Sequence, residues 1–141
     1  MDDVIINKAA SIEHSLARIR KEYQGHEPEL RSNQTRQDAI ILNLVRACET
    51  AIDMAMHLVR KQRLGVPQSS REAFDLIARA GHIDSELADQ LKRMVGFRNI
   101  AIHNYQEISL DILEDIILER LDDFHAYTRA LLQMKEAGTD E

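Results

Sequence analysis

The sequence is poor in several residue types, and each scarcity limits the folds open to it. Its 141 residues include no tryptophan, two prolines and five glycines, and aromatic residues make up 4% of the chain. Sheets and barrels favour aromatic and β-branched residues and use glycine and proline in their many turns. Residues that favour helices are plentiful instead, so the composition predicts an all-α protein.

Features of exported and membrane proteins are also scarce. The single cysteine, Cys48, cannot form a disulfide within the chain. No apolar run approaches the ~18 residues of a membrane span, and the acidic, amphipathic start lacks the basic and apolar parts of a signal peptide. We therefore expect a soluble, cytoplasmic protein that has no contact with membranes.

Positive charge is in deficit as well. The formal net charge is -6 and the pI is about 5.5, which argues against a protein that coats nucleic acid through bulk positive charge. Any role on nucleic acid must use a local site. The length suits one domain over residues 1–141, with a polar tail from about 135 to 141.

Apolar residues recur at alternating spacings of three and four, which predicts amphipathic helices. Capping residues mark their starts, as in Ser69 with Glu72 three positions later. Four long helices with short connections favour an up-and-down four-helix bundle with one additional short helix. The expected helices are 3–24, 35–63, a short one from Ser69 to Ala80, one that Asp84 or Ser85 caps, and a last one that Ser109 caps, with Leu113, Ile117, Leu121, Phe124 and Leu131 on its buried face.

One arginine interrupts this pattern. At 100° per residue, Arg98 lies in the middle of an apolar stripe of the fourth predicted helix. It can pair with a carboxylate of another helix, and Glu49 and Asp53 lie four residues apart on one side of the second helix. Alternatively, its planar guanidinium lines a groove and awaits an anion such as phosphate.

Two neighbours of Arg98 point in different directions on an ideal helix. Tyr105 falls on almost the same line, about 20° away, whereas His103 lies about 140° round. Arg98 and His103 therefore cannot face one phosphate from a single unbroken helix. Either the helix ends or distorts near Asn104, a residue that tolerates a left-handed cap, or a second copy of the chain completes the site, which makes a homodimer plausible.

These residues carry a family resemblance. Arg98, His103 and Tyr105 have the R-x4-H-x-Y form of the HEPN superfamily, and "RNIAIHNY", "ILNL" and "PQSSREAF" resemble its HepT-like branch over about residues 3–134. The resemblance implies a metal-independent endoribonuclease toxin that acts as a homodimer, with paired motifs in a cleft at the two-fold interface. Arg98 and His103 would be its catalytic pair, and Asn99 would orient or bind at the site.

The resemblance also implies an off-switch. In such toxins the motif tyrosine, here Tyr105, is the residue to which an MntA-like nucleotidyltransferase antitoxin adds AMP. We expect a phosphate on Tyr105 to lie within reach of Arg98 if both share one helix line. The second helix is expected to lend polar residues to the cleft wall or to ordinary helix pairs: Asn43, Arg46, Glu49 and Asp53.

The residue types suit RNA cleavage on chemical grounds. Imidazole can take a proton from a ribose 2′-hydroxyl or give one to the leaving 5′-oxygen at neutral pH, and arginine holds the charge that develops on phosphorus. RNA brings its own nucleophile, so we expect no metal or cofactor and 2′,3′-cyclic phosphate ends. Glu49, Asp53 and His57 form a ladder that resembles a metal site, but the E-x-x-H pairs of such helical sites do not occur.

A second class of function stays open at this stage. A helical module without catalysis would use the same groove to bind a nucleotidyltransferase or a nucleotide. Such a module has no need of His103, so the presence of both Arg98 and His103 favours the nuclease.

Overall fold

The computed structural model of the chain describes residues 2–134, and the predicted polar tail 135–141 lies outside the described residues. Within residues 2–134 every regular element is helical, so the all-α prediction is confirmed. The elements are α1 (Asp3–Tyr23), η1 (Glu27–Leu30), α2 (Gln34–Gln62), α3 (Ser70–Arg79), α4 (Ser85–His103), η2 (Tyr105–Glu107), α5 (Leu110–Asp115), η3 (Ile116–Arg120) and α6 (Leu121–Gln133).

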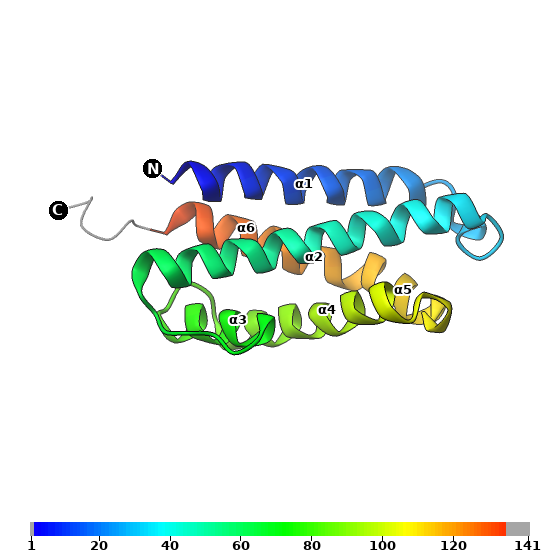
Figure 1. Cartoon of the computed structure of the whole chain (residues 1–141). Helices are drawn as coiled ribbons and strands as arrows, with labels where there is room; N and C mark the ends of the chain where they lie inside the picture. Colours follow the sequence, from blue (N-terminus) through cyan, green and yellow to red (C-terminus); the bar gives the residue numbers. More distant parts are fainter. Residues whose placement is uncertain (1, 135–141) are drawn as a thin grey trace.

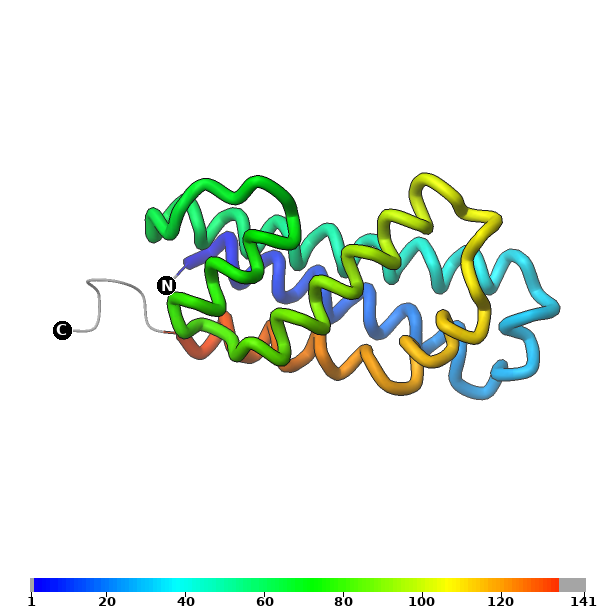
Figure 2. Tube along the Cα trace, turned by 90° about the horizontal axis from the view of Figure 1, so that it is seen from below, coloured from blue at the N-terminus to red at the C-terminus, as the bar shows by residue number. Residues whose placement is uncertain are grey.

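The long helices run back and forth along one axis (Figure 1). Helix α1 packs along α2 and against α6, while α4 contacts α2, α3 and α6. Seen from below, α4 crosses the layer of α1 and α2 (Figure 2). The start of α1 and the end of α6 lie at the same end of the molecule, and the turn after α4 lies at the other.

Side-chain caps explain why the helices begin where the sequence predicts. Ser69 Oγ accepts a hydrogen bond from the Glu72 backbone N–H at 3.2 Å, and Asp84, rather than Ser85, caps α4 through the Leu87 N–H at 2.7 Å. Ser109 caps α5 in the same way. Each bond satisfies a backbone donor that a helix start leaves free.

The last helix is not one continuous α-helix, which corrects the sequence expectation. Between α5 and α6, the segment Ile116–Arg120 is a π-helix. A π-turn closes i→i+5 bonds and therefore holds more residues than an α-turn. Within it, both Ile116 and Ile117 are buried. All five residues predicted for the buried face are in the core: Leu113, Ile117, Leu121, Phe124 and Leu131.

Cys48 lies in the core between α2 and α4. Its side chain is 2% exposed and the thiol donates to the Met94 carbonyl oxygen at 3.6 Å. Burial is the main reason why the pKa of this thiol rises to about 12. An apolar, unreactive core thiol is what its position in the sequence indicates.

Helix α4 ends at His103, where the site begins. The backbone N–H of Asn104 still bonds to the Ile100 carbonyl oxygen at 2.8 Å, but Asn104 has φ -142 and ψ 54. The helix therefore ends near Asn104, which is one of the two alternatives that the sequence leaves open, although Asn104 does not adopt the left-handed conformation. Among residues 2–134, no helix has both the length and the apolar character that a membrane crossing requires.

Candidate active site

Arg98 is half-buried, and its surroundings offer few hydrogen-bond acceptors to its guanidinium. Its Nη1 lies 3.8 Å from Glu49 Oε2 of α2, which is beyond hydrogen-bond distance, and the Glu49 side chain is 52% exposed. Within residues 2–134, the buried Nε of Arg98 has no hydrogen-bond partner. The carboxylate predicted from the second helix is therefore present, yet it leaves donors of the guanidinium free to bind an anion.

His103 is exposed at the last position of the same helix. Helix α4 keeps regular α geometry from Ser85 to His103, so the divergence of about 140° from Arg98 stands. No distortion brings the two side chains together within one chain. The end of α4 near Asn104 therefore does not direct both side chains at one phosphate, and the alternative of a second copy stays a prediction.

Tyr105 lies beyond the end of α4, in the short helix η2. The expectation that it continues the Arg98 line of the helix is therefore wrong, because the 100° spacing stops at His103. Its hydroxyl donates a hydrogen bond to Asp38 Oδ1 of α2. Burial and this bond raise the pKa of Tyr105 to about 12, although the residue is still 39% exposed.

The other predicted residues divide between the site and the rest of the fold. Glu49 reaches Arg98, but Asp53 pairs with Lys8 of α1 at 3.9 Å and is not brought to the site. Asn43 is buried and its amide donates to the Ala39 carbonyl oxygen at 2.9 Å on its own helix. Arg46 is exposed on α2, and Asn99 is half-buried beside Arg98 on α4.

A largely apolar groove lies between the Tyr105–Asp38 contact and the Arg98–Glu49 contact. It has a volume of about 450 Å³ and runs between α2 and the end of α4, lined among others by Gln34, Asp38, Ile41, Leu42, Ala101 and Ile102, with Tyr105 at one end. The contact between Glu49 and Arg98 lies about one helical turn beyond the groove residues Val45 and Ala101. Tyr105 with Asp38 and Arg98 with Glu49 are thus the two ends of one strip.

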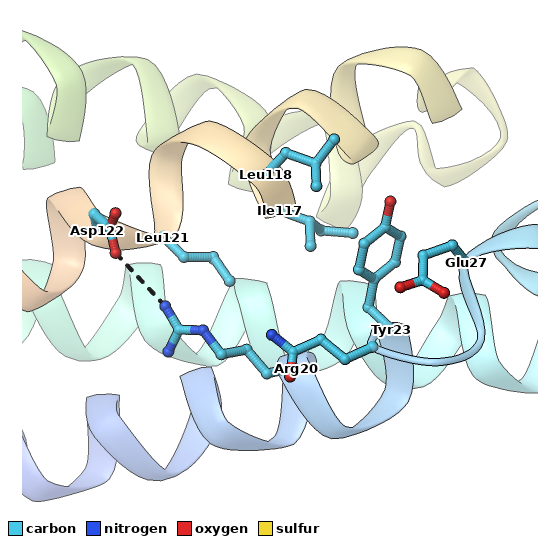
Figure 3. A pocket seen from close by; sticks show the side chains of 8 residues that line it. Arg20, Tyr23, Glu27, Ile117, Leu118, Leu121 and Asp122 are labelled. Carbon is cyan, nitrogen blue, oxygen red and sulfur yellow. Dashed lines mark ion pairs between the residues drawn. The ribbon is translucent and has the colours of Figure 1, made fainter.

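A second hollow, of about 380 Å³, lies on the side of α1 and the π-helix (Figure 3). Its polar side chains are bound to neighbours: Arg20 contacts His125 at 2.8 Å and Asp122 at 3.7 Å, and the Tyr23 hydroxyl donates to Glu114 at 2.7 Å. These pairs hold α1 to the last helical segments. The hollow contains no pair comparable to Arg98 and His103.

No described part of the chain gathers three or more His, Cys, Asp or Glu side chains as a metal ion requires. The three members of the ladder on α2 turn to different partners. Glu49 contacts Arg98 at 3.8 Å, Asp53 contacts Lys8 at 3.9 Å, and His57 contacts Asp2 at 2.8 Å.

Arg98, whose guanidinium has few partners, and the exposed His103 thus lie on the same helix, near the end of α4. The family described as "Ribonuclease HepT-like" matches residues 12–131. The chain belongs to this family and is a HepT-like ribonuclease.

Two similar proteins are named as nucleases as well. The chain is 47% identical over 127 residues to the mRNA nuclease HepT of Shewanella oneidensis. The aligned residues cover 90% of this chain and 95% of that protein. It is 27% identical over 97 residues to a putative RNase of Archaeoglobus fulgidus. This alignment covers 69% of this chain and 70% of that protein.

Solved structures show the same fold. A tri-AMPylated HEPN toxin of Shewanella oneidensis in complex with an MNT antitoxin superposes with a TM-score of 0.90 at 44% identity, covering 95% of this chain and 100% of that chain. A toxin–antitoxin structure with AMP-PNP gives a TM-score of 0.90 at 43% identity, with 94% and 100% covered.

Sequence reasoning missed Asp38. Its contact with Tyr105 joins positions 67 residues apart, and nothing in the local pattern around Asp38 distinguishes it from an ordinary helix-surface aspartate. Of the two glutamines near it, Gln34 is exposed and Gln37 is buried, and neither gives a signal that a sequence pattern would reveal.

Proposed function

We propose that this chain is the endoribonuclease toxin of a toxin–antitoxin pair, and that Arg98 and His103 cleave RNA in a cleft between two copies. The observation that carries the proposal is the guanidinium of Arg98, which is partly withdrawn from water. Among residues 2–134 it has no partner at Nε, and it lies 3.8 Å from the Glu49 carboxylate. A phosphate would supply the acceptors that are missing.

The proposed scaffold is an up-and-down four-helix bundle that works as a homodimer. A second copy related by a two-fold axis supplies a second Arg98 and a second His103, which overcomes their divergence on one helix. Large apolar side chains exposed around the strip support a covering partner: Leu42, Ile100, Ile102 and Tyr105. We place the pair in the cytoplasm, where RNA is available.

The proposed cleavage needs no external nucleophile. One His103 takes the proton of a ribose 2′-hydroxyl as its oxygen attacks phosphorus, and the His103 of the second copy gives a proton to the departing 5′-oxygen. Arg98 holds the charge on the non-bridging oxygens. The products are a 2′,3′-cyclic phosphate and a 5′-hydroxyl, so all atoms of the RNA are accounted for without water.

The proposed off-switch is AMP attached to Tyr105 by an MntA-like nucleotidyltransferase antitoxin. Support comes from the AMPylated state and antitoxin partner of the similar Shewanella toxin and from the exposure of Tyr105. The Tyr105 hydroxyl contacts Asp38, and Arg98 contacts Glu49. Asp38 and Glu49 are eleven positions apart on α2, so the Tyr105 hydroxyl lies roughly 16 Å from Arg98 along the helix. We therefore propose that attached nucleotide obstructs the groove, and not that one phosphate replaces the scissile phosphate.

The test is expression of the chain without any partner, scored for growth arrest and RNA decay. Arrest is expected for the wild type and for the control His26→Ala, whose histidine directly precedes η1 and has its side chain hydrogen-bonded to Glu29. It should be lost in His103→Ala. A folded wild type that cleaves no RNA, or a His103→Ala variant as toxic as the wild type, would favour the binding module without catalysis.

The switch has its own test. Co-expression with the nucleotidyltransferase should add AMP increments to intact mass, located on Tyr105 by peptide mapping and absent from Tyr105→Phe. Inhibition of an unmodified Tyr105 would mean that the antitoxin acts by binding alone.

A further inference from the structure

The Tyr105 hydroxyl does not stand free in solvent. It donates a hydrogen bond to the carboxylate of Asp38. Among the described residues that line the groove, Asp38 and Tyr105 are the titratable ones. A phenol in this position stays protonated at neutral pH, because burial and the hydrogen bond to Asp38 raise the pKa of Tyr105 to about 12. At neutral pH only about one molecule in 10⁵ carries a tyrosinate.

We propose that Asp38 is the general base for nucleotide transfer to Tyr105, so that the toxin itself supplies a catalytic group for its own modification. This inference rests on the proposed modification of Tyr105. Asp38 touches the reacting oxygen and already accepts its proton in a hydrogen bond, which is the geometry that a general base requires.

The step balances without a further reagent. The Tyr105 oxygen attacks the α-phosphorus of a nucleoside triphosphate, an O–P bond forms, and the bond from that phosphorus to the bridging oxygen breaks. Pyrophosphate leaves with the electron pair, and the phenolic proton passes to Asp38 and then to water. While Asp38 holds the proton it is neutral, so no like-charge contact with the anionic phosphodiester arises during the transfer itself.

A hydrogen-bonded chain holds Asp38 in place. Gln34 Nε2 donates to Asp38 Oδ1 at 2.8 Å and to Gln37 Oε1 at 3.2 Å, and the buried Gln37 in turn donates to the Leu30 carbonyl oxygen at 2.9 Å. Such a chain fixes a side chain that would otherwise rotate freely on a helix surface. The carboxylate is thus oriented by the fold before any partner arrives, and the open groove leaves room for the triphosphate.

The test is the rate of AMP transfer from ATP to the full chain at saturating MntA-type nucleotidyltransferase, followed by intact mass. Asp38→Asn should slow the first addition by about 10²-fold or more, while Asp38→Glu restores part of the rate. The matched control is Asp115→Asn, which removes an exposed carboxylate of α5. Circular dichroism and the saturation curve check that each variant folds and binds the transferase.

The pH profile separates a base from a residue that only supports the fold. Without the base, the rate should follow the tyrosinate fraction and rise about tenfold per pH unit between pH 7 and 9, whereas the wild-type rate should change little. An Asp38→Asn rate within twofold of the wild type, or parallel pH profiles, would overturn the role of Asp38 while leaving the switch intact. A wild type that receives no AMP on Tyr105 would remove both proposals.

Discussion

Replacing Arg98 with methionine should make the protein more stable and inactive. The buried Nε without a partner costs about 1–3 kcal/mol, and an ion pair with the half-exposed Glu49 at 3.8 Å returns only about 0.2–1 kcal/mol. Methionine keeps an apolar stem of similar length against the core. The net gain is about 1 kcal/mol, which corresponds to a rise in Tm of about 3 °C for a chain of this size.

The assay is thermal unfolding at one fixed protein concentration, because a dimer makes Tm depend on concentration. Glu49→Gln is the matched control: it removes the ion pair and keeps Arg98, so its loss should stay within about 1 kcal/mol. A fall in Tm of several degrees for Arg98→Met would refute the reasoning. It would mean that the guanidinium forms strong contacts, for example with a second copy of the chain.

Three further predictions follow from the described residues. RNA cleavage should persist in EDTA, leave 2′,3′-cyclic phosphate ends and disappear in His103→Ala; a requirement for added Mg²⁺ would contradict the mechanism. Light scattering at micromolar concentration should show a mass of twice 16.2 kDa, and a monomer alone would count against the interfacial site. Asp2→Ala should cost about 1–2 kcal/mol, measured by denaturant unfolding at pH 7, because Asp2 caps α1 and accepts hydrogen bonds from His57 and Lys61.

Asp2 also predicts how stability varies with pH. Burial opposes its ionisation, but the hydrogen bonds from Lys61, His57 and the Ile5 N–H outweigh this and hold the pKa of Asp2 far below its usual range. Because the folded-state pKa is depressed, the contribution is complete above the unfolded pKa of about 4 and is lost as the pH falls further. The difference in stability between wild type and Asp2→Ala should therefore shrink only below about pH 4.

Local signals in the sequence were enough to predict the helices. The predicted ranges 3–24 and 35–63 agree with α1 and α2 to within one residue at each end. Side-chain caps and apolar spacing are local properties, so the sequence around each end is enough to place it. The π-helix had no such signal, because the apolar positions Leu113, Ile117 and Leu121 also suit an unbroken α-helix. Burial of both Ile116 and Ile117 does not distinguish it either, because the regular helix α2 buries the neighbours Ile40 and Ile41 as well.

The sequence names candidate residues for the site, but it does not give their arrangement. The motif identified Arg98, His103 and Tyr105, and the pairing of Arg98 with Glu49 followed from an apolar position that holds a charge. The place of Tyr105 could not follow from helical spacing, since a chain that turns after His103 breaks that spacing. Its partner Asp38 depends on how α4 packs against α2, which is a property of the whole fold.

The buried thiol of Cys48 is a built-in reporter on the pair of helices that holds the site. It is the only cysteine of the chain, and its bond to the Met94 carbonyl oxygen joins α2 to α4 beside Glu49 and one turn before Arg98. Only a thiolate reacts with an alkylating agent, and burial keeps the Cys48 thiol protonated by raising its pKa. Labelling therefore requires these two helices to separate. The ratio of labelling rates in the native and unfolded chain gives the free energy of that opening, and a second copy or bound RNA that clamps α2 to α4 should slow the reaction in proportion.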